Sequence, residues 1–229
     1  MLTKPGTPRI VAEIRIPVGQ SELAGNLSVP AGGTSLVLFA HGSGSSRLSS
    51  RNIFVAEELQ NAGTGTLLFD LLTRSEEEFD QYTRQHRFDI GLLAERLISA
   101  TLWVNQQPRL RSLRIGYFGA STGSAAALVA ASRLPGRIGA VVSRGGRPDL
   151  AGQALEQVTA PTLLIVGGDD EVVIELNQRA YEHLTCEKDL RIVPGASHLF
   201  EEPGTLQVAA TLAAQWFSRH LQATVLTAR

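Results

Sequence analysis

The residues Gly119-Ala120-Ser121-Thr122-Gly123 form a G-x-S-x-G sequence between an apolar run and a run of small residues. A strand that turns sharply into a helix at such a motif presents the serine hydroxyl at the tip of the turn, as a nucleophile. The turn strains the backbone, and larger side chains two positions away would collide with the strand and the helix, which explains both glycines. The motif also occurs by chance in ordinary turns. Its place before an alanine-rich helical pattern favours a catalytic Ser121.

A nucleophilic serine needs a general base, because its hydroxyl is hardly ionised near neutral pH. The chain has five histidines, and His198 is the best candidate, because it follows the last predicted strand in a loop of small residues. The other four are better explained as surface, packing or loop-shaping residues: His41, His86, His183 and His220.

The base in turn needs a carboxylate that holds its tautomer and stabilises the imidazolium. Asp169 and Asp170 both follow the strand that precedes the histidine loop, and the order serine, aspartate, histidine is that of α/β-hydrolases. Asp70 also ends a strand but precedes the serine, so we expect it to hold a loop. The residues themselves are equally compatible with Asp169 and Asp170 as the acid.

A tetrahedral oxyanion needs two hydrogen-bond donors. The backbone N–H of Thr122, at the start of the helix after the nucleophile, is the first candidate, aided by the positive end of the helix dipole. The loop His41-Gly42-Ser43-Gly44 follows another predicted strand, and the backbone N–H of Ser43 is the second candidate.

Periodic apolar patterns place these residues in an α/β fold. Residues 10–16 and 23–29 predict an antiparallel hairpin, and the rest alternates between strands and helices, which predicts a mostly parallel sheet with helices on both faces. Further strands are expected at 35–40, 66–69, 113–118, 138–142, 162–166 and 190–193, and helices at 50–62, 89–105, 122–133, 174–184 and 205–221. Residues 71–87 are the least regular part, and their three consecutive glutamates suggest a solvated face or a loop.

Ligands of such sheets lie outside the carboxyl ends of the strands, where the polar loops of this chain fall. No repeat or linker interrupts the pattern, so residues 1–229 are expected to form one domain.

The composition limits the classes of partner that we expect the chain to bind. With 21 Lys+Arg against 22 Asp+Glu the chain is nearly neutral, which gives no sign of nucleic-acid or membrane binding, and a small-molecule substrate is expected. The N-terminus lacks an apolar signal-peptide core, and the single cysteine, Cys186, allows no internal disulfide, so a cytoplasmic location is expected. Neither zinc-ligand spacing nor a phosphate-binding loop is present, so we expect no metal and no cofactor. A monomer and a homodimer are equally compatible with the sequence.

At these motifs the chain resembles the α/β-hydrolases, and more narrowly the small serine hydrolases related to dienelactone hydrolase. The resemblance rests on the serine motif, the His41 loop, and the segments 167–173 and 195–200. It implies the α/β-hydrolase fold, and it implies Asp170 as the acid, three residues after the glycine that ends its strand. Dienelactone hydrolases use a cysteine where this chain has Ser121. That difference favours a carboxylic-ester, thioester or lactone hydrolase, and the short 142–161 segment argues against a large cap.

Arg144 and Arg147 follow a strand on the same edge of the sheet, and an arginine there can hold a substrate carboxylate in a bidentate pair. Salt bridges or surface charge explain them equally well, and Arg47 and Arg51 suggest the same role with less weight. Two rival functions remain: a binding module that keeps the fold without turnover, and a peptidase or acyltransferase that uses the same triad.

Overall fold

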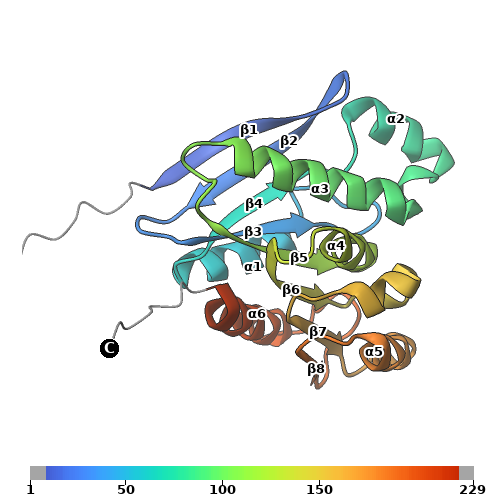
Figure 1. The fold of residues 1–229 in the computed structure, drawn as a ribbon. Coiled ribbons are helices and arrows are strands. Elements are labelled where there is room, and N and C mark those ends of the chain that lie inside the picture. The colour runs from blue at the N-terminus through green and yellow to red at the C-terminus, as the bar shows by residue number, and fades with distance from the viewer. Residues whose placement is uncertain (1–8, 222–229) are drawn as a thin grey trace, which may run out of the picture.

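The structure is a computed structural model that describes residues 9–221 (Figure 1). Within these residues an eight-stranded sheet has the order β1-β2-β4-β3-β5-β6-β7-β8. The first two strands form an antiparallel hairpin that pairs antiparallel with β4, and all other neighbours are parallel. The strands are β1 (Ile10–Val18), β2 (Ser21–Val29), β3 (Ser35–Ala40), β4 (Gly65–Phe69), β5 (Arg114–Ala120), β6 (Ile138–Arg144), β7 (Thr162–Gly167) and β8 (Lys188–Val193). The predicted hairpin and parallel sheet are confirmed.

Helices connect the strands and cover both faces of the sheet (Figure 1). The α-helices are α1 (Ser50–Asn61), α2 (Arg74–Thr83), α3 (Ile90–Gln106), α4 (Thr122–Arg133), α5 (Glu171–His183) and α6 (Thr205–Leu221), with 3₁₀ segments η1 (His86–Phe88) and η2 (Pro148–Gln157). Only η2 lies between β6 and β7, in agreement with the short connection that the sequence predicted.

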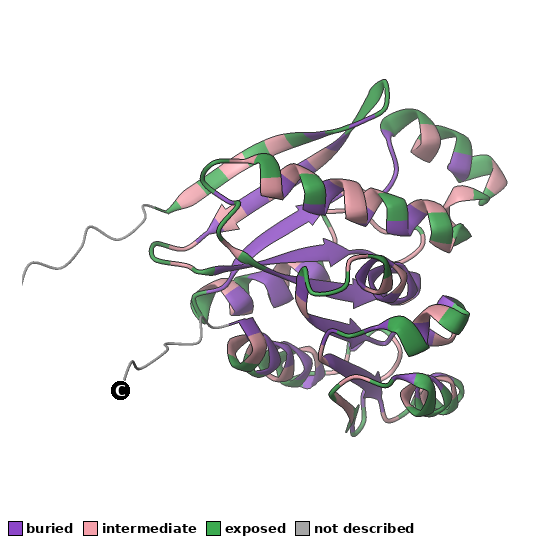
Figure 2. Cartoon of the chain, viewed as in Figure 1, coloured by how far each residue is buried: buried purple, intermediate pink, exposed green. Residues whose placement is uncertain are grey.

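The sheet separates two hydrophobic cores, as strands buried on both faces require. Along β3, Leu36, Leu38 and Ala40 pack in the core that contains α3 and α4. The intervening Val37 and Phe39 pack in the core that contains α1 and α6. Strands β3, β4 and β7 are buried along their whole length (Figure 2). The loops at their carboxyl ends are therefore fixed by a rigid support.

The expectation of an irregular segment at 71–87 was wrong. Residues Arg74–Thr83 form α2, whose first turn has a capping box. The Thr73 hydroxyl accepts from the Glu76 N–H, and the Glu76 carboxylate accepts from the Thr73 N–H at 2.8 Å. This T-x-x-E pattern is a recognised helix start that the run of glutamates obscured.

No helix among residues 9–221 is both long enough and apolar enough to cross a membrane.

Candidate active site

Ser121 lies at the turn between β5 and α4, with φ +50° and ψ −124°. A non-glycine residue in this conformation costs on the order of 1–3 kcal/mol, and it persists only where neighbouring contacts enforce it. Here the Ser121 carbonyl accepts the Arg147 N–H at 3.1 Å, the Ser124 N–H at 3.1 Å and the Ser124 hydroxyl at 2.6 Å. The backbone is thus held in a strained turn that the sequence motif predicted.

The two glycines of the motif are required by close packing. A Cβ on Gly119 would lie 2.3 Å from the Cα of Ser124 in α4, and a Cβ on Gly123 would lie 2.1 Å from the carbonyl oxygen of Ala40 in β3. Real Cβ atoms do not approach other atoms so closely, so the helix can lie against the sheet at this point only with glycine at both positions. The collisions that the sequence analysis anticipated are therefore present.

His198 lies in the loop after β8, and its Nδ1 is 2.6 Å from Oδ2 of Asp170. Asp169 makes no such contact; its backbone N–H donates to the carbonyl of Ala196 in the histidine loop. A Cβ on Gly167 would lie 2.3 Å from the Ala196 carbonyl oxygen, so this glycine lets the end of β7 approach the histidine loop. Of the two aspartates that the sequence left open, Asp170 is the one that contacts the histidine.

Ser121 and His198 line the same cavity, of about 260 Å³, at the carboxyl edge of the sheet. Ser43 and Arg144 line it as well, so one cavity brings together the last residue of β6 and residues that follow β3, β5 and β8. We call it the serine cavity. Arg147 is not among the residues that line it.

Comparisons with known proteins show the family to which the chain belongs. The family model described as "Dienelactone hydrolase family" matches residues 36–223, which include Ser121, Asp170 and His198. The chain belongs to the dienelactone hydrolase family.

Two solved structures resemble the chain at very different levels of sequence identity. The crystal structure of a dienelactone hydrolase from Anabaena variabilis ATCC 29413 is 58% identical, with a TM-score of 0.92 over 93% of this chain and 99% of that one. Est1E from Butyrivibrio proteoclasticus is 14% identical with a TM-score of 0.76 over 91% of this chain and 98% of that one, which shows the fold alone. The predicted α/β-hydrolase fold is confirmed.

Two curated relatives from Mycobacterium tuberculosis strains CDC 1551 and H37Rv are each 57% identical over 209 residues. Both carry the name "Putative phosphoribosyl transferase". The match covers 91% of this chain and 46% of either relative, so the chain spans about half the length of the curated relatives it matches.

The glycine-rich loop after β3 is held by hydrogen bonds on both sides of Gly42. The Ser43 N–H donates to the Thr122 hydroxyl at 2.9 Å. His41 is buried; its Nε2 accepts the Leu71 N–H at 3.1 Å, so its Nδ1 carries the proton and donates to the Gly42 carbonyl at 3.0 Å. Burial lowers the pKa of His41 and keeps it neutral, although the Gly42 carbonyl and Asp70 act in the opposite direction. His41 therefore shapes the loop, as expected from its position.

The two arginines after β6 differ in their partners. The Arg147 guanidinium makes a bidentate pair with Asp149, with distances of 2.9 and 2.8 Å. Arg144 is buried, and among residues 9–221 no carboxylate lies within ion-pair distance of it. Its Nη1 donates weakly to the Leu199 carbonyl at 3.4 Å, and its guanidinium lies 5.6 Å from the ring centre of Phe200. Its Nε has no partner in the part of the chain that the structure describes. The geometry thus separates two arginines that the sequence treated alike.

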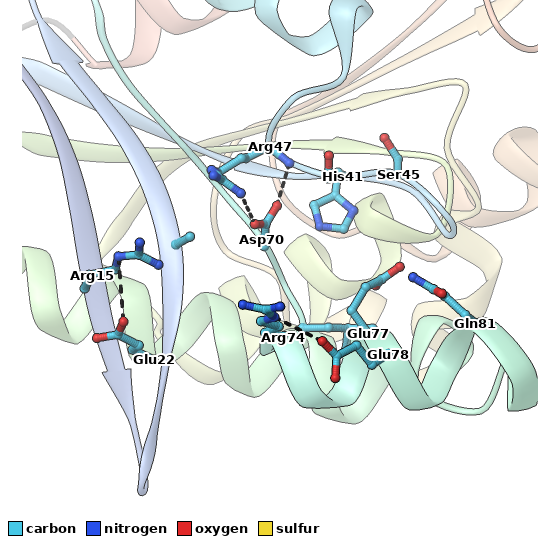
Figure 3. Close-up of a pocket in the computed structure, with 13 residues that line it drawn as sticks. Arg15, Glu22, His41, Ser45, Arg47, Asp70, Arg74, Glu77, Glu78 and Gln81 are labelled. Carbon is cyan, nitrogen blue, oxygen red and sulfur yellow. Dashed lines mark hydrogen bonds and ion pairs between the residues drawn. The ribbon is translucent and has the colours of Figure 1, made fainter.

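A second cavity, of about 430 Å³, shares Ser45 with the serine cavity but contains neither Ser121 nor His198. We call it the charged cavity, because the hairpin, the glycine-rich loop and α2 supply it with arginines and carboxylates. Figure 3 shows that its arginines face carboxylates of the chain itself. The pairs are Arg15–Glu22, Arg47–Asp70 and Arg74–Glu78. Asp70 also accepts the backbone N–H of Arg47 at 2.8 Å, in the loop-holding role that the sequence predicted.

Proposed function

We propose that this chain is a serine hydrolase that cleaves carboxylic esters, thioesters or lactones through an acyl-enzyme intermediate. The observation that carries the proposal is the strained Ser121 in one cavity with a histidine whose Nδ1 lies 2.6 Å from the Asp170 carboxylate. Nucleophile, base and orienting acid in this arrangement are recognised by geometry and role. Membership of a hydrolase family supports the same reaction class.

In the first step the Ser121 hydroxyl attacks the ester carbonyl while Nε2 of His198 takes its proton. Asp170 bonds to the Nδ1–H of His198, which leaves the lone pair of Nε2 free and stabilises the imidazolium once it forms. The imidazolium then protonates the leaving alcohol or thiol. In the second step, water gives a proton to His198 and attacks the acyl-enzyme; the imidazolium then returns the proton to the Ser121 oxygen as the acid leaves.

The negative charge on the tetrahedral intermediate requires donors, and we assign this role to the backbone N–H groups of Thr122 and Ser43. Thr122 is the first residue of α4, where the helix dipole favours a negative charge. The Ser43 N–H donates to the neutral Thr122 hydroxyl in the free enzyme. An oxyanion is a stronger acceptor than a hydroxyl, so exchange of partner stabilises the transition state more than the ground state.

The name of the mycobacterial relatives applies to proteins about twice as long as the matched region. The residues on which our proposal rests lie within the stretch that matches the hydrolase family, 36–223. The proposal therefore does not depend on the activity of the remaining part of those relatives.

Hydrolysis of 4-nitrophenyl acetate by the wild type and by Ser121→Ala tests this proposal. We expect kcat to fall by on the order of 10⁴–10⁶-fold in the variant, because loss of the nucleophile disables the whole triad. Ser132→Ala is the control, since this serine lies near the C-terminal end of α4, donates to the Val129 carbonyl and does not line the serine cavity. Retained turnover in folded Ser121→Ala would overturn the proposal.

A further inference from the structure

Two arginines line the serine cavity, and among the described residues only one of them pairs with a carboxylate. Arg51 from α1 and Arg144 from the end of β6 line it, and among the described residues no aspartate or glutamate does. Asp170 contacts His198, and Glu201 pairs with Arg51 at 3.1 Å but is mostly exposed to solvent. Among the described residues, Arg144 is therefore the arginine of this cavity that has no carboxylate partner.

Arg144 is energetically costly in the free enzyme. Its exposed fraction is 6%, and a buried cation without a carboxylate partner loses hydration that a single long hydrogen bond does not replace. Burial, together with the nearby Arg51 charge, lowers the pKa of Arg144 to about 10. The group still carries its charge at neutral pH.

Asn52 adds a second unsatisfied polar group in the same cavity. Its exposed fraction is 2%, it lines the cavity, and its Oδ1 atom has no hydrogen-bond partner within residues 9–221. Its amide is held beside the arginines on the first turns of α1, whose N-cap is Ser49. The Asn52 Oδ1 oxygen accepts hydrogen bonds, so its missing partner is a hydroxyl or N–H donor, whereas the missing partner of the Arg144 Nε–H is an acceptor such as an anionic oxygen.

We propose that Arg144, assisted by Arg51, forms an anion subsite that selects esters carrying a carboxylate or phosphate group close to the scissile carbonyl. The inference rests on the proposed function and names the substrate class of that same site. A guanidinium offers a planar fork to two anionic oxygens, which is the geometry of carboxylate and phosphate recognition. The anionic group of the ligand would supply the partner that Arg144 lacks among the described residues.

The position of Arg144 limits where the anion lies relative to the bond that breaks. In the sheet Arg144 pairs with Ala120, the residue before the nucleophile, and its carbonyl accepts the Ser121 N–H at 3.4 Å. The two side chains thus start from adjacent strands at the same level of the sheet. The cavity has a volume of about 260 Å³, so the subsite fits a short acyl or leaving group.

The test compares 4-nitrophenyl hydrogen glutarate with 4-nitrophenyl pentanoate, which have acyl chains of the same length and differ in the terminal carboxylate. For the wild type we expect kcat/KM to be on the order of 10–100-fold higher for the anionic ester, as for hydrogen bonds to a charged group. In Arg144→Met this ratio should fall to about 1. Arg147→Met is the matched control, because Arg147 is paired with Asp149 and lies outside the cavity, and its ratio should match the wild type.

Inhibition of pentanoate turnover by free glutarate and by inorganic phosphate distinguishes the two kinds of anion. Competitive inhibition by one of them in the wild type, lost in Arg144→Met, identifies the group that the subsite takes. The rise in Tm that the same anion causes, measured on wild type and Arg144→Met, reports anion binding without turnover. It therefore remains informative if Arg144→Met has altered kinetics. Arg144→Lys, which keeps the charge but not the fork, should give an intermediate ratio and provides a second variant.

The proposal is overturned if the wild type shows a ratio near 1, or if folded Arg144→Met keeps the wild-type ratio. In either case the proposed hydrolase function would still stand, provided that the neutral ester is hydrolysed and that this hydrolysis depends on Ser121. If neither ester is hydrolysed, the hydrolase function fails, and stabilisation by glutarate or phosphate still decides whether Arg144 binds an anion.

Discussion

Two neighbouring cavities share Ser45, and an arginine of one differs from the arginines of the other in its partners. In the charged cavity, Arg47 pairs with Asp70, and two further arginines face carboxylates of the chain (Figure 3). In the serine cavity, Arg144 has no carboxylate partner among the described residues and is more deeply buried than Arg47. A paired charge serves the fold, whereas a buried charge without a partner costs stability and is retained where a ligand completes it.

The largest expected contrast concerns two aspartates that each follow a strand. Asp170→Asn should lower kcat by on the order of 10³–10⁴-fold, because an amide favours the wrong histidine tautomer, with little change in Tm. Asp70→Asn should lower Tm by about 2–4 °C through loss of the Arg47 pair, and change kcat by less than about 10-fold. Steady-state kinetics and thermal unfolding of both variants measure this. Equal effects of the two substitutions on kcat would remove the functional distinction between the cavities.

The second contrast concerns the stability of two arginine variants. Arg47→Met removes one member of a partly exposed pair and should lower the free energy of unfolding by about 1 kcal/mol. Arg144→Met removes an unpaired buried charge and keeps most of the side-chain volume, so stability should stay the same or rise. Denaturant unfolding without added anions tests both. A large loss of stability in Arg144→Met would show that Arg144 has a structural role, in contradiction to this comparison.

The smallest effect is the pH dependence that His41 contributes. His41 lines the charged cavity, and burial lowers its pKa below the ordinary value of 6.5. The unfolded chain therefore binds a proton on this histidine at a higher pH than the folded chain does. Stability should thus decrease as the pH falls below about 6.5.

His41→Asn removes this titration, and its stability should depend less on pH between 7 and 5 than that of the wild type. Urea unfolding at several pH values, with both proteins in the same buffers, provides the measurement. Identical pH slopes for the two proteins would show that protonation of His41 does not affect folding.

Local patterns predicted the sheet and the nucleophile turn well. The strands around β3, β5 and β7 are continuous apolar runs, and the glycines on either side of Ser121 fit a turn that only small residues allow. These features depend on neighbouring residues in the sequence. The same holds for the T-x-x-E capping box of α2, which was present in the sequence but was outweighed by the three glutamates.

Features that depend on residues far apart in the sequence were harder to predict. The choice of Asp170 over Asp169 depends on how the loop after β7 meets the histidine loop, and the sequence reached it only through a family resemblance. Arg144 and Arg147 are three positions apart, and only the folded backbone separates the one that pairs with Asp149 from the one that enters the cavity. That Thr122 accepts the Ser43 N–H was likewise not visible from the sequence.

The most direct test of the central claim is intact-mass analysis after treatment with a fluorophosphonate, on the wild type and on Ser121→Ala. An activated serine should give a single covalent adduct on the wild type, located by peptide mapping at Ser121, and no adduct on the variant. An unlabelled wild type that is folded, or a Ser121→Ala variant that is labelled equally well, would contradict the assignment of Ser121 as the nucleophile.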